Sequence, residues 1–302
     1  MSTVSTSMAH NEQLEPSHFR RSVELWVRHR FRAATAPLRA LPQSIIIGTQ
    51  KAGTSSLYSY LEQHPQLAAS QHPSKSWVSE KEVHYFSGGS QPGDDYYSKG
   101  LNWYRSHFPL RKQLGSHVQA FEATPLYLFH PLAANRIRSI LPDVKLLVLL
   151  RDPVERSISS YFHQVREQRE FLPILEAFQE EGVRLSQSIM ESDYNSFDFL
   201  YHSYLARSRY REQLDRYFAL FPREQIQIHC SEDFFANPET VLRSIFEFLG
   251  VDPDFRVPNL EAMNVGSNRG KVDVEVYNYL ADYFRPHNKA LFELTGREFP
   301  WV

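Results

Sequence analysis

The chain has 302 residues, of which 42% are hydrophobic and 14% aromatic, so it can bury a sizeable core and is too apolar for a disordered protein. Its net charge of −2 gives no reason to expect nucleic acid or a polyanionic partner, so any anion binding must come from local arrangement. The single cysteine, Cys230, excludes an internal disulfide, is expected to be buried in an apolar run, and fits a reducing, cytoplasmic location.

The N-terminal region is interpreted as a basic, partly flexible extension of residues 1–40 that precedes a single domain of residues 41–302. Residues 18–39 carry six arginines against one glutamate, with hydrophobic residues at roughly helical spacing. This pattern predicts a helix packed on the flank of the domain. The alternative is an arm that makes peripheral contact with a membrane surface or binds an anionic acceptor. No apolar run reaches the about 18 residues of a membrane span, and the N-terminus lacks the hydrophobic core of a signal peptide.

Strands alternate with helices along the rest of the chain. We expect strands at 43–48, 117–123, 144–150 and 226–229, and helices at 54–63, 132–141, 153–169, 204–221, 238–249 and 274–295. The last helix should be interrupted near Pro286, residues 71–100 should form a loop with a short element at 83–86, and residues 171–200 are less regular. The alternation predicts an α/β fold with a P-loop-like, doubly wound central parallel sheet flanked by helices. Ligands bind such sheets at the carboxyl ends of the strands.

The first chemistry-bearing segment is the sequence Gly-Thr-Gln-Lys-Ala-Gly-Thr-Ser at 48–55, which joins a predicted strand to a predicted helix. Its glycines allow a tight turn whose backbone N–H groups, with the helix N-terminus, form an anion cradle. The spacing is similar to the P-loop of nucleotide kinases, but Thr54 stands where their lysine would be and the lysine lies inside the loop at position 51. Such a loop suits a 5′ group with one phosphate and one transferable unit. The predicted ligand-binding residues are Lys51, Ala52, Gly53, Thr54 and Ser55.

The second segment follows the apolar strand predicted at 144–150. Arg151 ends that strand and offers a fixed guanidinium fork to a phosphate, and Ser159 faces the same edge two turns into the next helix. Pro153 begins this helix, Asp152 is expected to cap it, and Arg156 is interpreted as a structural ion-pair partner. Two phosphate sites on neighbouring strands fit a nucleotide that is phosphorylated at both its 5′ and 3′ positions.

At this point the sequence resembles the sulfotransferase superfamily, whose donor is 3′-phosphoadenosine 5′-phosphosulfate (PAPS). Residues 48–55 are similar to its 5′-phosphosulfate loop and residues 151–159 to its 3′-phosphate motif. Residues 80–86 (EKEVHYF) and the tail at 286–301 resemble the heparan sulfate and related bacterial carbohydrate branch. The resemblance covers residues 43–302. It implies transfer of a sulfuryl group to an acceptor hydroxyl, with a carbohydrate as the leading acceptor and PAPS as the co-substrate.

The resemblance also implies roles for individual residues. Glu82 would be the general base, with His84 as the competing candidate, and a positioned base contributes about 10²–10⁴-fold to the rate. Lys51 would neutralise the charge that grows on the leaving phosphate oxygen. The segment at 268–271 is similar to the family's Lys-Gly-Arg loop with its two basic residues exchanged. It assigns three further residues to the nucleotide: Arg269, Gly270 and Lys271.

Two departures from the family pattern concern the acceptor. Ala123 stands where glycosaminoglycan-modifying relatives carry a lysine, and the chain has too few cysteines for their disulfide-closed loop. An amine or lipid acceptor therefore stays open, as do a magnesium-dependent P-loop kinase of small molecules and a nucleotide-binding module without catalysis. No cluster of residues with metal-ligand spacing occurs in the sequence, so no metal is expected.

Overall fold

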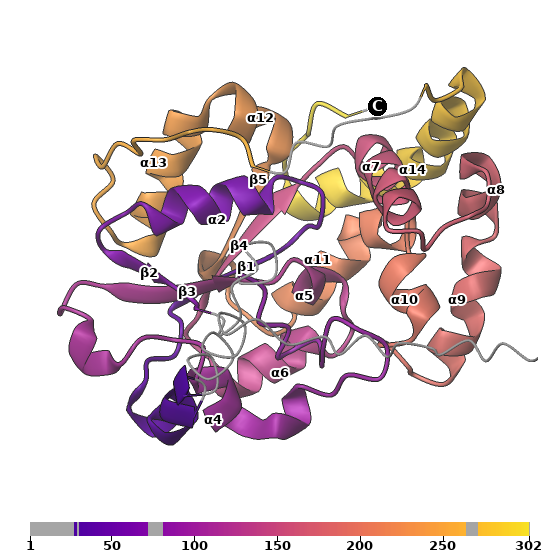
Figure 1. Cartoon of the computed structure of the whole chain (residues 1–302). Helices are drawn as coiled ribbons and strands as arrows, with labels where there is room; N and C mark the ends of the chain where they lie inside the picture. The colour runs from indigo at the N-terminus through magenta and orange to yellow at the C-terminus, as the bar shows by residue number, and fades with distance from the viewer. Residues whose placement is uncertain (1–26, 29, 72–80, 264–270, 302) are drawn as a thin grey trace, which may run out of the picture.

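The computed structural model describes residues 27–28, 30–71, 81–263 and 271–301, and its centre is a parallel five-stranded sheet (Figure 1). The strand order is β2-β3-β1-β4-β5, and every neighbouring pair is parallel. The predicted α/β fold with a central parallel sheet is confirmed. The strands are β1 (Ser44–Gly48), β2 (Leu67–Ala69), β3 (Gln119–Ala123), β4 (Lys145–Leu150) and β5 (Ile226–Cys230).

Helices cover both faces of this sheet (Figure 1). One face packs against α2 (Thr54–Glu62), α12 (Ser231–Ala236) and α13 (Pro238–Leu249). The other packs against α4 (Gly100–Arg105), α5 (Leu126–Phe129), α6 (Ala133–Ile140) and α11 (Tyr210–Phe218). The remaining α-helices are α7 (Pro153–Arg166), α8 (Ile174–Gln179), α9 (Glu181–Met190), α10 (Phe197–Tyr201) and α14 (Val274–Thr295), and short 3-10 turns lie at Ala36–Leu38, Tyr97–Lys99, Arg111–Gln113, Ala206–Ser208 and Arg223–Gln225.

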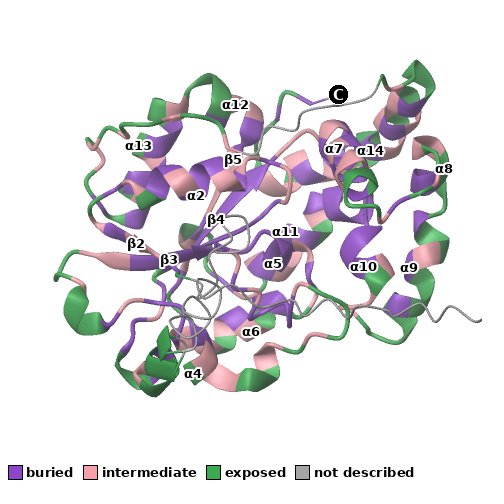
Figure 2. Cartoon of the chain, viewed as in Figure 1, coloured by how far each residue is buried: buried purple, intermediate pink, exposed green. Residues whose placement is uncertain are grey.

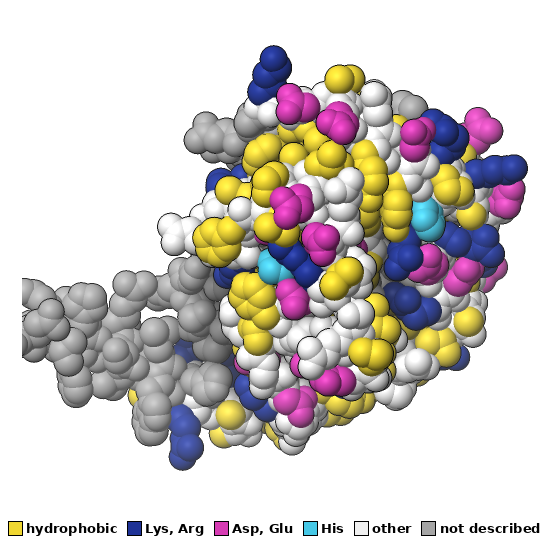
Figure 3. Space-filling model, turned by 90° about the vertical axis from the view of Figure 1, so that its right-hand side faces the viewer, with side chains coloured by type: hydrophobic (Ala, Val, Ile, Leu, Met, Phe, Trp, Pro, Cys, Tyr) yellow, Lys and Arg dark blue, Asp and Glu magenta, His cyan; other side chains and the backbone are white. Residues whose placement is uncertain are grey.

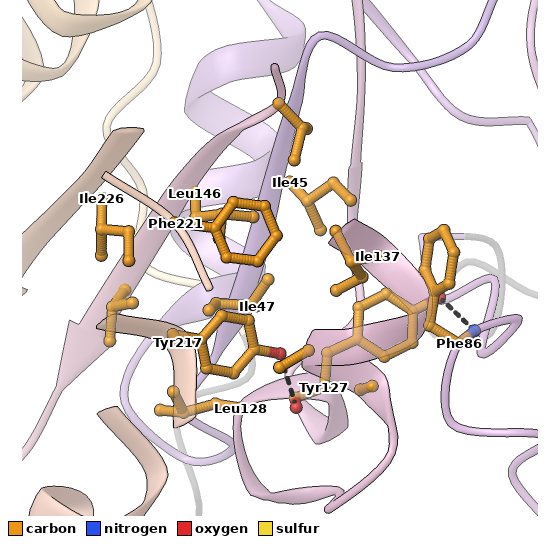
Figure 4. Close-up of a cluster of buried hydrophobic side chains, with 14 of the residues drawn as sticks. Ile45, Ile47, Phe86, Tyr127, Leu128, Ile137, Leu146, Tyr217, Phe221 and Ile226 are labelled. Carbon is orange, nitrogen blue, oxygen red and sulfur yellow. Dashed lines mark hydrogen bonds between the residues drawn. The ribbon is translucent and has the colours of Figure 1, made fainter. Parts of the chain in front are cut away.

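The central strands are buried on both faces, as Figure 2 shows by their colour. In β1, Ile46 enters the cluster beneath α2 and α13, whereas Ile45 and Ile47 enter the opposite cluster with Tyr127 and Tyr217 (Figure 4). The Tyr217 hydroxyl donates to the carbonyl oxygen of Tyr127 at 2.8 Å, so this buried polar group is satisfied. Close packing on both sides fixes the strand ends, where parallel sheets place their ligands.

A third hydrophobic cluster lies beside the sheet, where α7, α8 and α14 meet residues 204–205. Figure 3 looks onto this side of the molecule and shows hydrophobic side chains interspersed with charged ones. The most exposed hydrophobic side chains of this region include Phe171, Val183 and Met190. The segment at 171–200, which the sequence describes only as less regular, therefore contributes three short helices that extend the domain past the sheet.

The part of the N-terminal extension that is described packs on the domain as a helix, as predicted. Residues 30–34 are helical, and Arg32 donates to the carbonyl oxygens of Ser106 (2.6 Å) and Phe108 (3.3 Å). Arg39 donates to the same Phe108 oxygen at 2.7 Å. Residues 1–26 and 29 lie outside the described ranges, and the domain boundary at residue 40 stays a prediction. Within those ranges, every helix is too short or too polar to cross a bilayer.

Several predicted elements differ from the structure. The predicted helix at 204–221 begins only at Tyr210, because the backbone of Arg209 (φ −81°, ψ 72°) is not helical and separates α11 from the 3-10 turn before it. Residues 83–86 form neither helix nor strand. The interruption predicted near Pro286 is wrong, since α14 is continuous. Cys230 is buried as predicted; burial and its hydrogen bond to Glu232 raise the pKa of the thiol to about 12.

Candidate active site

The candidate site lies where the two adjacent central strands β1 and β4 end, which is the position that the sheet topology favours. The loop after β1 requires its two glycines. A Cβ at Gly48 would lie 2.6 Å from the Leu128 side chain, and one at Gly53 would lie 2.7 Å from the Phe235 ring. Gly53 also has φ = +94°, in the left-handed region that favours glycine. The loop therefore packs closely against Leu128 and Phe235, and α2 begins directly after it.

The loop after β1 and the segment after β4 are in contact. Arg151 donates from Nη1 to the carbonyl oxygen of Lys51 at 3.0 Å, and Lys51 itself has φ = +75°. Burial, then the positive charges of Arg166, Arg151, Arg156 and Lys81, lower the pKa of Lys51 to about 8. Each of these charged neighbours is a cation. These cations gather around the loop in a chain whose net charge is −2, although Arg151 also pairs with Glu155 at 3.5 Å.

The predicted base lies beside the donor loop and is connected to it by a lysine that the sequence analysis did not assign. Glu82 Oε2 lies 3.0 Å from His84 Nε2, and its Oε1 lies 3.2 Å from Lys81 Nζ. Lys81 Nζ also donates to Ser55 Oγ at 2.8 Å. Burial by itself would raise the pKa of Glu82, but Lys81 and His84 outweigh it and lower this pKa to about 2. Glu82, His84 and Ser55 are thus brought together.

A buried hydrogen-bond network holds the segment of the predicted base. The Thr124 hydroxyl accepts from the backbone N–H groups of Val83 (3.1 Å) and His84 (3.4 Å) and donates to Glu122 Oε2 at 2.8 Å. Glu122 also accepts from the Tyr104 hydroxyl at 2.5 Å. Burial raises the pKa of Glu122 to about 7 although these hydroxyls favour its ionised form. The role of this network could not be predicted, because its contacts join segments about 40 residues apart.

A second buried cation lies under the donor loop and was also missed. Arg207 is 5% exposed and donates to Gln50 Oε1 at 2.7 Å, to Ser203 Oγ at 2.9 Å and to the Leu200 carbonyl at 2.7 Å. No carboxylate of the described residues forms an ion pair with it. Burial, followed by the charge of Arg156, lowers the pKa of Arg207 to about 9. Its pairing with a loop residue 157 positions away leaves no local signal in the sequence.

In the segment after β4 the structure confirms the predicted helix cap, while phosphate binding by Arg151 and Ser159 stays a prediction. Asp152 caps α7, because its side chain accepts from the N–H groups of Val154 (2.7 Å) and Glu155 (3.2 Å). Ser159 lies half-buried on α7, and its side chain forms no hydrogen bond to another described residue. The interpretation of Arg156 as an ion-pair partner is wrong for the described part of the chain. Its guanidinium is fully buried and donates instead to Ser208 Oγ and the Tyr204 carbonyl.

The third predicted nucleotide contact lies mostly outside the described residues. This holds for Arg269 and Gly270, whereas Lys271 is described and lies exposed just before α14. The chain that leads to this segment does run along α2. Tyr60 donates to the Leu260 carbonyl at 2.7 Å, and the Met263 N–H donates to Ser56 Oγ at 2.9 Å.

The loop predicted within residues 71–100 meets the less regular segment that follows residue 171. Asn195, between α9 and α10, donates to the Asp94 carbonyl at 2.9 Å, and the Tyr201 hydroxyl donates to the Ser90 carbonyl at 3.3 Å. In the ranges that the structure describes, no group of three or more metal-ligating side chains occurs. Catalysis without a metal stays a prediction.

Comparison with known proteins gives the family of the chain. Residues 41–269, well over half of the chain, match the model of the sulfotransferase domain. The chain belongs to the sulfotransferase family. This finding confirms the resemblance that the motifs at 48–55 and 151–159 carry, while the roles of the individual residues stay predictions.

Named relatives of this sulfotransferase include eukaryotic and bacterial proteins. It is 30% identical to the membrane-associated sulfotransferase kil1 of Dictyostelium discoideum and 29% identical to the mouse heparan sulfate glucosamine 3-O-sulfotransferase 3B1, in each case over 87% of this chain. The chain spans 67% and 65% of the length of these relatives. The crystal structure of a sulfotransferase from Alicyclobacillus acidocaldarius matches with a TM-score of 0.66 and 30% identity, over 86% of this chain and 98% of that one.

Proposed function

We propose that this sulfotransferase moves a sulfuryl group from PAPS to a hydroxyl group of a carbohydrate. The observation that carries this proposal is the set of cations around the loop after β1 together with a carboxylate at its edge. Lys51, Lys81 and Arg151 surround the loop, and Glu82 contacts one of them directly. A polyanionic donor would neutralise the positive charge, and the carboxylate would serve the acceptor.

The two ends of the donor would lie on adjacent strands. The 5′-phosphosulfate would bind the N–H groups of residues 51–55 and the ammonium of Lys51, at the N-terminus of α2. The 3′-phosphate would bind Arg151 and Ser159, with Arg269, Gly270 and Lys271 as further contacts. The contact between Arg151 and the Lys51 carbonyl supports this arrangement, since it holds both anion sites on one rigid edge.

The transfer needs a base and charge neutralisation. The acceptor oxygen attacks the sulfur atom in line with the leaving oxygen and forms a new O–S bond. The bond from sulfur to the bridging phosphate oxygen breaks at the same time, and its electron pair stays on that oxygen. Glu82 takes the acceptor proton, and Lys51 neutralises the leaving bisphosphoadenosine. His84 would orient the carboxylate through its contact at 3.0 Å. His84 has φ = +54°, the kind of backbone strain that clusters at functional sites.

A carbohydrate acceptor is supported by the names of the heparan sulfate relatives. The buried Ala123 limits this support, since the relatives' lysine is missing there. The cytoplasmic location and the peripheral membrane contact of residues 18–39 also stay proposals. The name of the Dictyostelium relative favours the membrane contact, whereas the burial of Arg32 and Arg39 withdraws two arginines from such a surface.

The test is transfer of labelled sulfate from PAPS to a panel of glycans, amines and lipids. We expect transfer to a glycan, a loss of at least about 10²-fold for Glu82→Gln, and a smaller loss for His84→Asn. Lys112→Met, at an exposed lysine far from the site in sequence, serves as the matched surface control. No transfer to any acceptor, together with no binding of 3′,5′-bisphosphoadenosine, would refute the proposal. Preferential binding of ATP with magnesium would indicate a kinase instead.

A further inference from the structure

Lys81 occupies a position between the donor loop and the predicted base. Its side chain is only 8% exposed, and its ammonium donates to Ser55 Oγ at 2.8 Å while it pairs with Glu82 Oε1 at 3.2 Å. An ammonium has three N–H donors, so one donor remains beyond these two contacts with described residues. Because Ser55 lies in the first turn of α2, this donor group is within one hydrogen bond of the predicted 5′-phosphosulfate site.

The same contact makes Glu82 a weak base in the arrangement seen here. Among the described residues, the charged or titratable groups that face Glu82 are Lys81 and His84 from its own segment and Arg207 from the turn before α11. Together with the hydrogen bond from His84, the charge of Lys81 lowers the pKa of Glu82 to about 2, although burial acts in the opposite direction. A general base works best when its pKa is near the working pH, so this carboxylate would take a proton from a hydroxyl inefficiently.

We propose that Lys81 couples donor binding to the activation of Glu82, an inference that rests on the function proposed above. Without the donor, Lys81 holds the carboxylate of Glu82 in place. When the anionic end of the donor occupies the loop at Ser55, it attracts the ammonium of Lys81. Glu82 is then free to accept the proton of the acceptor. Lys81 is then a positioning residue for the base and a direct contact of the donor.

Charge favours this exchange. The 5′ end of the donor carries a phosphate and a sulfuryl group, whereas Glu82 carries one carboxylate that His84 can continue to hold. Lys51 and the backbone N–H groups bring the donor to within reach of an ammonium that already lies against the loop, so only a small movement of Lys81 is needed. The coupling favours binding of the donor before transfer and leaves the base weak when no sulfuryl group is present to transfer.

The experiment is the pH dependence of kcat at saturating donor and acceptor, together with calorimetric binding of 3′,5′-bisphosphoadenosine. Lys81→Met removes the charge and keeps the length of the side chain, and Lys112→Met is the matched control at an exposed lysine. We expect Lys81→Met to weaken nucleotide binding by at least about 10-fold and to leave the acid limb of kcat where the wild type has it, because in the donor complex the lysine no longer faces Glu82.

Two results would overturn the inference. One is a Lys81→Met acid limb that lies about one pH unit or more above that of the wild type, which would place the lysine on Glu82 throughout the reaction. The other is nucleotide binding that is unchanged in this variant. If Lys81→Met does not fold, the wild type alone decides: its kcat should fall with an apparent pKa near the ordinary glutamate value of about 4.3, and full activity down to about pH 3 contradicts the coupling. Transfer by the wild type separates these outcomes from failure of the proposed function.

Discussion

Thr124→Val tests whether the buried network below the predicted base controls the rate. The substitution keeps the shape of the side chain and removes the hydroxyl, which accepts from the N–H groups of Val83 and His84 and donates to Glu122. Thr124 is 0% exposed, so bulk water does not reach the groups that lose their partner. Glu122 keeps the hydrogen bond from Tyr104.

The expected magnitude follows from the groups left without a partner. A buried donor that loses its acceptor costs about 1–3 kcal/mol, and the contact of His84, at 3.4 Å, is the weaker of the two. The free energy of unfolding should therefore fall by about 2–4 kcal/mol, which for a chain of this size lowers Tm by about 3–6 °C. A shift of the base segment by about 1 Å can reduce kcat by about 10²-fold, because proton transfer depends on position.

The assay combines thermal unfolding followed by circular dichroism with kcat for sulfate transfer. Thr124→Ser is the matched control, since it keeps the hydroxyl and loses one buried methyl group, at a cost of about 1 kcal/mol. We expect Ser to keep kcat within about threefold of the wild type while Val does not. If the two variants share the same Tm and the same kcat, the hydroxyl does not position the base and the reasoning is wrong.

Three further predictions concern the donor loop and its support. Nucleotide affinity should fall as the pH rises through about 8, because Lys51 loses its charge there. Lys51→Ala should abolish this pH dependence and weaken binding by about 10–100-fold. Calorimetry at pH 7 and pH 9 measures both effects. Gly53→Ala should cost more than about 1 kcal/mol of stability and weaken nucleotide binding, because the new Cβ meets the Phe235 ring. Gly296→Ala, with φ = +66° in the same left-handed region and open space around it, measures the backbone strain alone. Glu122 has a pKa of about 7 in the folded protein, above its unfolded value of about 4.3. The stability that it contributes is therefore complete below about pH 4.3 and is lost as the pH rises through about 7. Urea unfolding should show a lower free energy of unfolding at pH 8 than at pH 5, and this difference should be smaller in Glu122→Gln.

The elements that the sequence predicts well are those whose signals are local. The isoleucine run before Gly48 gives β1, and the apolar run before Arg151 gives β4. Pro153 and Asp152 mark the start of α7 within two residues. Because adjacent parallel strands end at one edge, these signals also predict that the two anion-binding motifs converge, and the contact of Arg151 with Lys51 agrees with that expectation.

Other features depend on contacts that no local pattern reveals. Lys81 reaches Ser55 across 26 positions and Arg207 reaches Gln50 across 157, so neither residue is marked by its own neighbours in the sequence. The error at Pro286 has a different cause. Proline removes one backbone donor and usually ends a helix, but Pro286 lies on the exposed side of α14, where the freed carbonyl can bind water. The opposite side buries Phe284 and Leu291, and this packing keeps the helix continuous.

The structure also changes how the departure at position 123 is understood. From the sequence, Ala123 removes a charge that glycosaminoglycan-modifying relatives carry, which leaves the donor site short of a cation. In the structure Ala123 is buried in the apolar cluster beneath α2. The ammonium of Lys81 lies at the first turn of that helix, where it donates to Ser55. A cation is therefore available at the donor loop from another segment.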